Sequence, residues 1–134
     1  MQNILVFLVD DDIDDQEIFE MALKEIQPLA RCAFADDGIV ALEKLRTDTS
    51  FLPQVIFIDI NMPRMNGIQC LREIKRSSRL HHIPAFMYST SAESSIVEEC
   101  LKIGASGFIK KEIYVEALQK QLLQVLRQIN TRSV

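Results

Sequence analysis

Four short apolar runs of the sequence end in polar side chains that could carry out chemistry together. These groups are Asp10-Asp11-Asp12, Asp59 with Asn61, Ser89-Thr90-Ser91, and Lys110-Lys111. Carboxylates that lie close together repel one another unless a cation neutralises them. Mg²⁺ prefers one or two carboxylates together with a carbonyl, waters and a phosphoryl oxygen. An ammonium and a hydroxyl opposite would complete a site for a phosphoryl group, which a carboxylate can itself accept.

The acidic run from Asp10 to Asp15 also has a simpler interpretation. Asp in front of a helix is a good N-cap, and a run of acids is commonly just a solvated surface. This segment alone does not decide between capping and function. The ordered set of acid, hydroxyl and ammonium groups, one at each strand end, favours a functional site.

The apolar runs predict the strands that must position these groups. Runs this short, bounded by Asp, Pro or Gly, are typical of strands buried on both faces. We expect strands at Ile4–Val9, Val55–Ile58, Ala85–Tyr88 and Phe108–Ile109, with a weaker candidate at Cys32–Ala35. Segments of helical periodicity follow each of them, the last with an apolar face from Val115 to Ile129.

This alternation predicts an α/β fold. We expect a doubly wound five-stranded parallel sheet of flavodoxin-like (βα)5 type, with strand order 2-1-3-4-5 and right-handed crossovers. Function in such sheets gathers outside the carboxyl ends of the strands. The first and third strands are neighbours in this order, so Asp10, Asp11 and Asp59 should converge there.

Length, charge and cysteine spacing exclude several classes of protein. The 134 residues predict one domain, residues 1–134, without an output domain. A formal net charge of −4 argues against sequence-blind binding of nucleic acid. The run Ile4–Val9 is too short for a signal peptide or membrane insertion. Three cysteines without metal or disulfide spacing indicate a reduced, cytoplasmic protein.

Three blocks of the sequence resemble the signatures of the response-regulator receiver domain of two-component signalling, in its single-domain form. The blocks are Ile4–Asp12, Val55–Gly67 and Gly104–Lys111, and the resemblance extends from Ile4 to about Ile129. The middle block, with its Asp59-Ile60-Asn61-Met62-Pro63 sequence, is the most specific.

The resemblance implies a role for each site residue. Asp59 is similar to the phosphoacceptor. Asp10 and Asp11 are similar to the acidic pair that organises Mg²⁺ together with Asp59. Asp10 would contact the ion chiefly through water. The backbone carbonyl of Asn61 would be a further Mg²⁺ ligand. Ser89 and Lys111 match the hydroxyl and the lysine that contact the phosphoryl group, and Phe108 matches the aromatic switch residue. Asp12 would flank the site without binding the ion.

The resemblance also implies a function: a stand-alone response regulator, a phosphoprotein that is not a turnover enzyme on a separate substrate. A sensor histidine kinase or a phosphotransfer protein of a phosphorelay would phosphorylate Asp59. Phosphorylation would then alter a surface formed by the fourth helix, fifth strand and fifth helix for binding of an unidentified protein partner. Dimerisation through that surface on phosphorylation is a further hypothesis from the same resemblance.

Neighbouring residues compete for two of these roles, and one position departs from the family pattern. Family spacing, five residues after Pro84, favours Ser89 over Thr90, and strand alternation together with the family register favours Lys111 over Lys110. Glu112 replaces the proline that commonly follows the lysine. A cis bond before a non-proline residue costs about 3 kcal/mol, so we expect a trans bond there.

Two other functions compete with the phosphoacceptor. Glu112 is the sequence support for a receiver-like interaction module that works without phosphorylation. An aspartyl-nucleophile phosphatase of the haloacid dehalogenase class also places an attacking Asp at a strand end. That class uses Asp-x-Asp, with the second Asp as general acid, whereas Asn61 occupies this place here and cannot act as the acid.

Overall fold

The protein is described by a computed structural model that covers residues 3–90 and 93–132. The strands are β1 (Leu5–Val9), β2 (Arg31–Ala35), β3 (Val55–Asp59), β4 (Ala85–Ser89) and β5 (Gly107–Lys110). The helices are α1 (Ile13–Ile26), α2 (Gly38–Thr47), α3 (Gly67–Arg76), α4 (Ser94–Ile103) and α5 (Val115–Arg132). All strand pairs are parallel, and the sheet order is β2-β1-β3-β4-β5. The predicted flavodoxin-like fold is confirmed.

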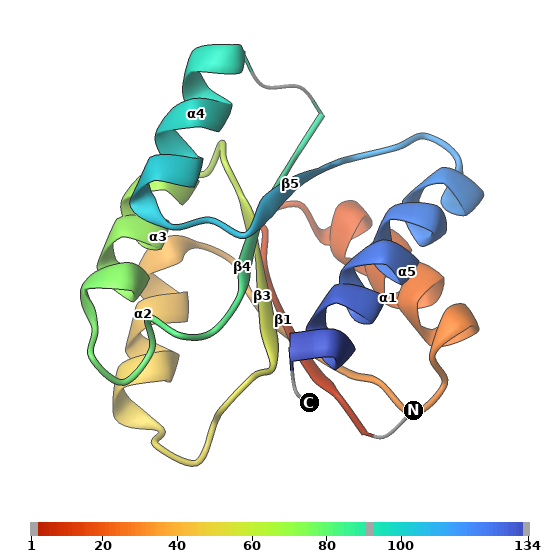
Figure 1. Ribbon diagram of the computed structural model, residues 1–134, viewed down its shortest axis with the longest axis horizontal. Coiled ribbons are helices and arrows are strands. Elements are labelled where there is room, and N and C mark those ends of the chain that lie inside the picture. Colours follow the sequence, from red (N-terminus) through yellow and green to blue (C-terminus); the bar gives the residue numbers. More distant parts are fainter. Residues whose placement is uncertain (1–2, 91–92, 133–134) are drawn as a thin grey trace.

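The sheet lies between two layers of helices. Helices α1 and α5 cover one face, and α2, α3 and α4 cover the other (Figure 1). The strands β1, β3 and β4 are buried almost throughout, which explains why their sequences are nearly continuous apolar runs. Each face has its own apolar core, one including Phe7 and Leu71 and the other including Phe19 and Leu122.

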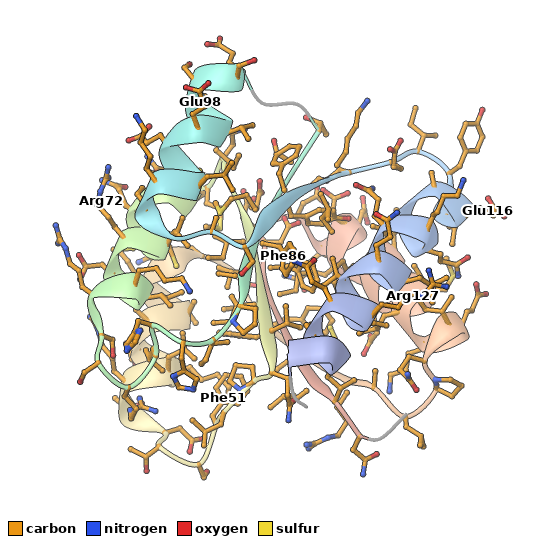
Figure 2. The ribbon with its side chains drawn as sticks, viewed as in Figure 1. Phe51, Arg72, Phe86, Glu98, Glu116 and Arg127 are labelled. Atoms are coloured by element: carbon orange, nitrogen blue, oxygen red, sulfur yellow. The ribbon has the colours of Figure 1, made fainter. Side chains whose placement is uncertain are left out.

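Aromatic rings fill both layers. The Phe7 and Phe51 rings meet edge to face, with centroids 4.9 Å apart, on the side of α2. On the α5 side, the Phe57 ring stacks on that of Phe86 at 5.7 Å. Figure 2 shows Phe86 near the middle of the molecule and Phe51 toward the end of the sheet where β3 begins. Such contacts, each burying a large ring, fix the strands that carry the polar loops.

Polar caps at the helix starts shape the loops that follow the strands. Asp12 accepts hydrogen bonds from the backbone N–H groups of Asp14 and Asp15 and so caps α1. Asp37 caps α2, and Asn66 forms a reciprocal capping box with Gln69 at α3. The loops after β1, β2 and β3 therefore end in residues that satisfy the first backbone N–H groups of the next helix.

Some apolar side chains of the helices reach the surface. Ile18, Ile39 and Leu101 are 39%, 40% and 50% exposed, which is normal for single apolar side chains on a protein surface. Cys70 and Cys100 are buried and Cys32 is half-buried, and all three are free thiols. Within residues 3–90 and 93–132, no helix combines the length and apolar character needed to span a membrane.

Gly67 allows the start of α3 to pack directly against the end of β3. A Cβ at this position would lie 2.2 Å from the backbone oxygen of Asp59 and 2.8 Å from the Cα of Ile60. Both neighbours are backbone atoms, so no side-chain rotation can relieve the overlap. Glycine is therefore required where the chain leaves the strand that ends in Asp59.

We expect Gly67→Ala to lower the free energy of unfolding by about 1 to 3 kcal/mol, because α3 must shift to accommodate the methyl group. Gly38→Ala is the matched control, since Gly38 is also the first residue of its helix and its added Cβ would first meet the flexible Met65 side chain at 3.0 Å. Urea unfolding of both variants measures the difference. Equal destabilisation by the two substitutions would contradict this account of Gly67.

Candidate functional site

Three carboxylates gather at the carboxyl ends of β1 and β3. Asp59 is the last residue of β3, and Asp10 and Asp11 follow β1 directly. One oxygen from each of Asp10, Asp11 and Asp59 lies within 4.8 Å of the others. Asp10 and Asp59 are buried, whereas Asp11 is exposed. The parallel pairing of β1 with β3 brings these residues together across about fifty positions of sequence.

Local hydrogen bonds orient the two buried acids. Oδ1 of Asp10 accepts from the backbone N–H of Asp12 at 3.0 Å, and Oδ1 of Asp59 accepts from that of Asn61 at 3.2 Å. These turns occupy one oxygen of each carboxylate and leave Oδ2 to face the site. The side chain of Asp12 caps α1 instead, in line with its expected place beside the carboxylate cluster.

Lys111 places its ammonium among the acids. Its Nζ lies 2.9 Å from Oδ2 of Asp10, 3.4 Å from Oδ2 of Asp59 and 2.8 Å from Oδ2 of Asp15. The same Nζ lies 5.2 Å from the centre of the Tyr88 ring. Lys110, the competing lysine, is exposed, and its backbone N–H and C=O bond to the side chain of Gln121 on α5. Strand alternation therefore separates the two lysines as expected.

The acids and the lysine border an open pocket of about 230 Å³. Asn61, Ser89 and Thr90 complete its lining, together with Asp11, Asp12, Asp15, Asp59 and Lys111. Ser89 is buried at the end of β4 and Thr90 is exposed. Of the three hydroxyl candidates, Ser89 and Thr90 both line the pocket, and Ser91 lies outside the described residues.

Phe108 lies outside this pocket. Its ring lines a small cavity on the α4 side of the sheet with Ile60, Met87, Val97 and Cys100, and with Leu101 and Gly107. Phe108 is half-buried and pairs in register with Met87 of β4. The peptide bond between Lys111 and Glu112 is trans, as expected. Glu112 itself is half-buried, and Ile113 after it is 92% exposed.

Burial dominates the electrostatics of the two inner acids. It raises the pKa of Asp59 from 3.8 to about 7; Lys111 opposes this effect and the nearby Asp10 adds to it. Burial likewise raises the pKa of Asp10, against the opposing hydrogen bonds from Asp12 and Lys111. Burial alone would lower the pKa of Lys111, but hydrogen bonds to Asp15 and Asp10 outweigh it and raise that pKa. The site therefore holds more negative charge than one ammonium neutralises.

Two ion pairs at this edge were not predicted from the sequence. Asp15 contacts Lys111, and Arg64 pairs with Asp37, whose pKa is lowered first of all by that hydrogen bond. Arg64 lies in the loop after β3 and has a left-handed backbone with φ of 65°. Each pair joins residues 27 or more positions apart, and no local motif signals it. The acidic run did contain Asp15, but the sequence left the run undecided between capping and function and assigned no role to Asp15 itself.

The donor set fits a hard divalent cation. Mg²⁺ favours carboxylate and carbonyl oxygens over nitrogen or sulfur, and the cluster offers carboxylate oxygens only. The two buried acids with raised pKa values also show that the negative charge is costly without a further cation. Asp10, Asp11 and Asp59 are therefore suited to hold Mg²⁺.

Comparison with known proteins identifies the family of this chain. A model of the response regulator receiver domain matches residues 6–123. The chain belongs to this family. Receiver domains of response regulators serve as phosphoacceptors in two-component signalling and bind Mg²⁺ at an acidic pocket. They interact with histidine kinases or phosphotransfer proteins and with downstream targets. The resemblance of the sequence to the receiver domain is thereby confirmed.

Individual relatives match the receiver domain over nearly its whole length. The chemotaxis protein CheY of Pseudomonas aeruginosa is 27% identical, over 93% of this chain and 98% of its own. The two-component response regulator ORR5 of Oryza sativa subsp. japonica is 32% identical, over 91% of this chain and 88% of its own. The solved response regulator domain of Thermotoga maritima CheB is 30% identical with a TM-score of 0.80, covering 96% of this chain and 98% of that one.

The raised pKa of Asp59 predicts an unusual dependence of stability on pH. Between about pH 4 and about pH 7 the folded receiver domain retains a proton on Asp59 that the unfolded chain releases. Raising the pH through this interval therefore destabilises the metal-free protein. Asp59→Asn removes this effect, so the variant should gain roughly 2 kcal/mol or more over the wild type across the interval.

Urea unfolding in the presence of a chelator measures this difference. Asp14→Asn is the control, because Asp14 is an exposed acid and the variant should follow the wild-type trend with pH. Parallel stability curves for the wild type and Asp59→Asn would show that burial does not raise the pKa of this carboxyl group.

Proposed function

We propose that Asp59 is the phosphoacceptor and that it receives a phosphoryl group from the phosphohistidine of a sensor kinase or a phosphotransfer protein. The observation that carries this proposal is the convergence of Asp10, Asp11 and Asp59 within 4.8 Å at a pocket that Lys111 also borders. The buried Asp10 and Asp59 and the exposed Asp11 would hold Mg²⁺, together with the backbone carbonyl of Asn61.

The reaction transfers the phosphoryl group between a nitrogen and an oxygen. An oxygen of Asp59 attacks the phosphorus in line, the P–N bond to the donor imidazole breaks, and the imidazole leaves with the electron pair. The ammonium of Lys111 and the hydroxyl of Ser89 would contact the transferred oxygens. Bound Mg²⁺ would supply charge neutralisation at those oxygens.

The donor needs no acid from this chain, because the imidazole is a sufficient leaving group once the phosphoryl oxygens are neutralised. Asn61 stands where an aspartyl phosphatase places its general acid, and its side chain has no proton to give in that role. The chain is therefore expected to accept and release its own phosphoryl group and to lack turnover on a separate substrate.

Incubation with Mg²⁺ and acetyl phosphate tests the acceptor. We expect the intact mass of the wild type to rise by one phosphoryl group, since a small phosphodonor can replace the kinase when positioning and charge neutralisation reside in the acceptor. Asp59→Asn should gain no mass, and chelation of Mg²⁺ should prevent the gain in the wild type.

A folded wild type that binds Mg²⁺ and gains no mass would overturn the proposal. That outcome would favour the interaction module that works without phosphate, and Glu112→Pro would then test whether the departure at this position is the cause. Adduct formation on the Asp59→Asn variant would instead assign the acceptor to another side chain.

We further infer that phosphorylation changes the surface formed by α4, β5 and α5. The phosphoryl group would draw Ser89 and Lys111 toward it, and the backbone N–H of Lys111 donates to the carbonyl of Ser89 at 2.8 Å, so the two residues move as a unit. Phe108 lies on β5, beside the cavity next to α4, where such a shift would reposition its ring. The altered surface would bind a partner protein or a second copy of the chain.

Hydrogen exchange across α4, β5 and α5, with and without the phosphoryl mimic beryllofluoride, tests this switch. We expect a change in the wild type and a much smaller change in Ser89→Ala, because the hydroxyl that reaches for the phosphoryl group is gone. Thr90→Ala is the matched control and should respond as the wild type does. Equal losses in both variants would contradict the assignment to Ser89, and light scattering of the same samples shows whether a second copy binds.

A further inference from the structure

Lys111 is shared between two groups of acids that differ in their place in the fold. Asp10 follows β1, Asp59 ends β3, and both belong to the carboxylate cluster. Asp15 instead lies in the first turn of α1. The ammonium is 2.9 Å and 3.4 Å from the first two, and 2.8 Å from Asp15. Its nearest carboxylate contact is therefore with an acid outside the cluster.

The start of α1 holds Asp15 in place. Asp12 accepts a hydrogen bond from the backbone N–H of Asp15 at 3.2 Å, and Gln16 donates to the backbone carbonyl of Asp10 at 2.7 Å. These bonds tie the first turn of the helix to the end of β1. The backbone that carries Asp15 is thus held in place, and its carboxylate lies beside Lys111 and is about 30% exposed to solvent.

An ammonium and a divalent cation would compete for the same oxygens. Oδ2 of Asp10 and Oδ2 of Asp59 face Lys111, and both acids belong to the set that would hold Mg²⁺. Two cations that share these oxygens repel each other, so entry of the ion requires Lys111 to withdraw. The contacts of Lys111 offer one direction for this movement, toward Asp15 and the edge of the pocket.

We propose that Asp15 is a positioning residue that draws the Lys111 ammonium away from Asp10 and Asp59 and so raises the affinity of the site for Mg²⁺. This inference rests on the proposed function, because it assigns a task to Asp15 in preparing the same acceptor site. Asp15 does not join the carboxylate cluster and acts through the lysine. The ammonium remains near enough to contact the phosphoryl group once Asp59 has accepted it.

Asp14 provides a close control for the charge of Asp15. It lies one residue earlier in the first turn of α1 and is exposed. Asp14→Asn and Asp15→Asn remove the same charge from the same turn, so both change the helix-terminus electrostatics and the net charge alike. The two substitutions differ in whether Lys111 loses its partner.

Calorimetric titration with Mg²⁺ alone, at fixed pH and salt, tests the inference. We expect Asp15→Asn to weaken Mg²⁺ binding about tenfold, the size of a coupling between contacting charged groups, and Asp14→Asn to weaken it far less. Asp15→Glu should restore most of the affinity. In a Lys111→Met background, which keeps the aliphatic stem, Asp15→Asn should have no more effect than Asp14→Asn.

Each other result overturns the inference. Equal effects of Asp14→Asn and Asp15→Asn would mean that Asp15 contributes only general negative charge. A large effect of Asp15→Asn that persists in Lys111→Met would mean that Asp15 contacts the ion directly. The proposed function fails separately, by the absence of a phosphoryl adduct on a wild type that binds Mg²⁺, so the two failures are distinguishable.

Discussion

The structure depends on an imbalance of charge at one edge of the sheet. Asp10, Asp59 and Asp15 surround the single ammonium of Lys111, with Asp11 exposed beside them. Burial raises the pKa values of Asp10 and Asp59, so keeping both ionised is unfavourable without another cation. A divalent cation bound by these acids would relieve the free energy that this arrangement costs in the metal-free protein.

The rest of the fold offsets this unfavourable free energy and holds the charged residues in a rigid framework. The strands β1 and β3 are buried on both faces, and their apolar residues pack against two helical layers. Gly67 lets α3 begin against the backbone of Asp59, and Asp12 both caps α1 and stays out of the cluster. A site that keeps like charges close needs such support, because loosely held acids would move apart.

The sequence predicted those parts that follow from short-range patterns and from topology. Buried strands read as apolar runs, and the carboxyl ends of adjacent parallel strands meet, so the meeting of Asp10, Asp11 and Asp59 follows from the strand order. The contact of Lys111 with Asp15, 96 residues away, depends on how α1 sits against the sheet and on two side-chain rotamers. The pair of Arg64 with Asp37 likewise depends on a left-handed residue in a loop. No periodicity encodes either contact.

Ser89 and Phe108, the two residues of the proposed switch, lie on the neighbouring strands β4 and β5. Ser89 borders the charged pocket, and Phe108 borders an apolar cavity next to α4; within the part of the chain that the structure describes, these two cavities share no lining residue. The link is the pairing of β4 with β5, in which Met87 faces Phe108 and the carbonyl of Ser89 accepts from Lys111. The proposed switch would act through this strand pair, because the cavity beside Phe108 has a volume of only about 10 Å³ and leaves the ring little free space. The proposed switch would thus combine firmly held acids at the carboxyl edge of the sheet with a strand pair that carries the change to Phe108.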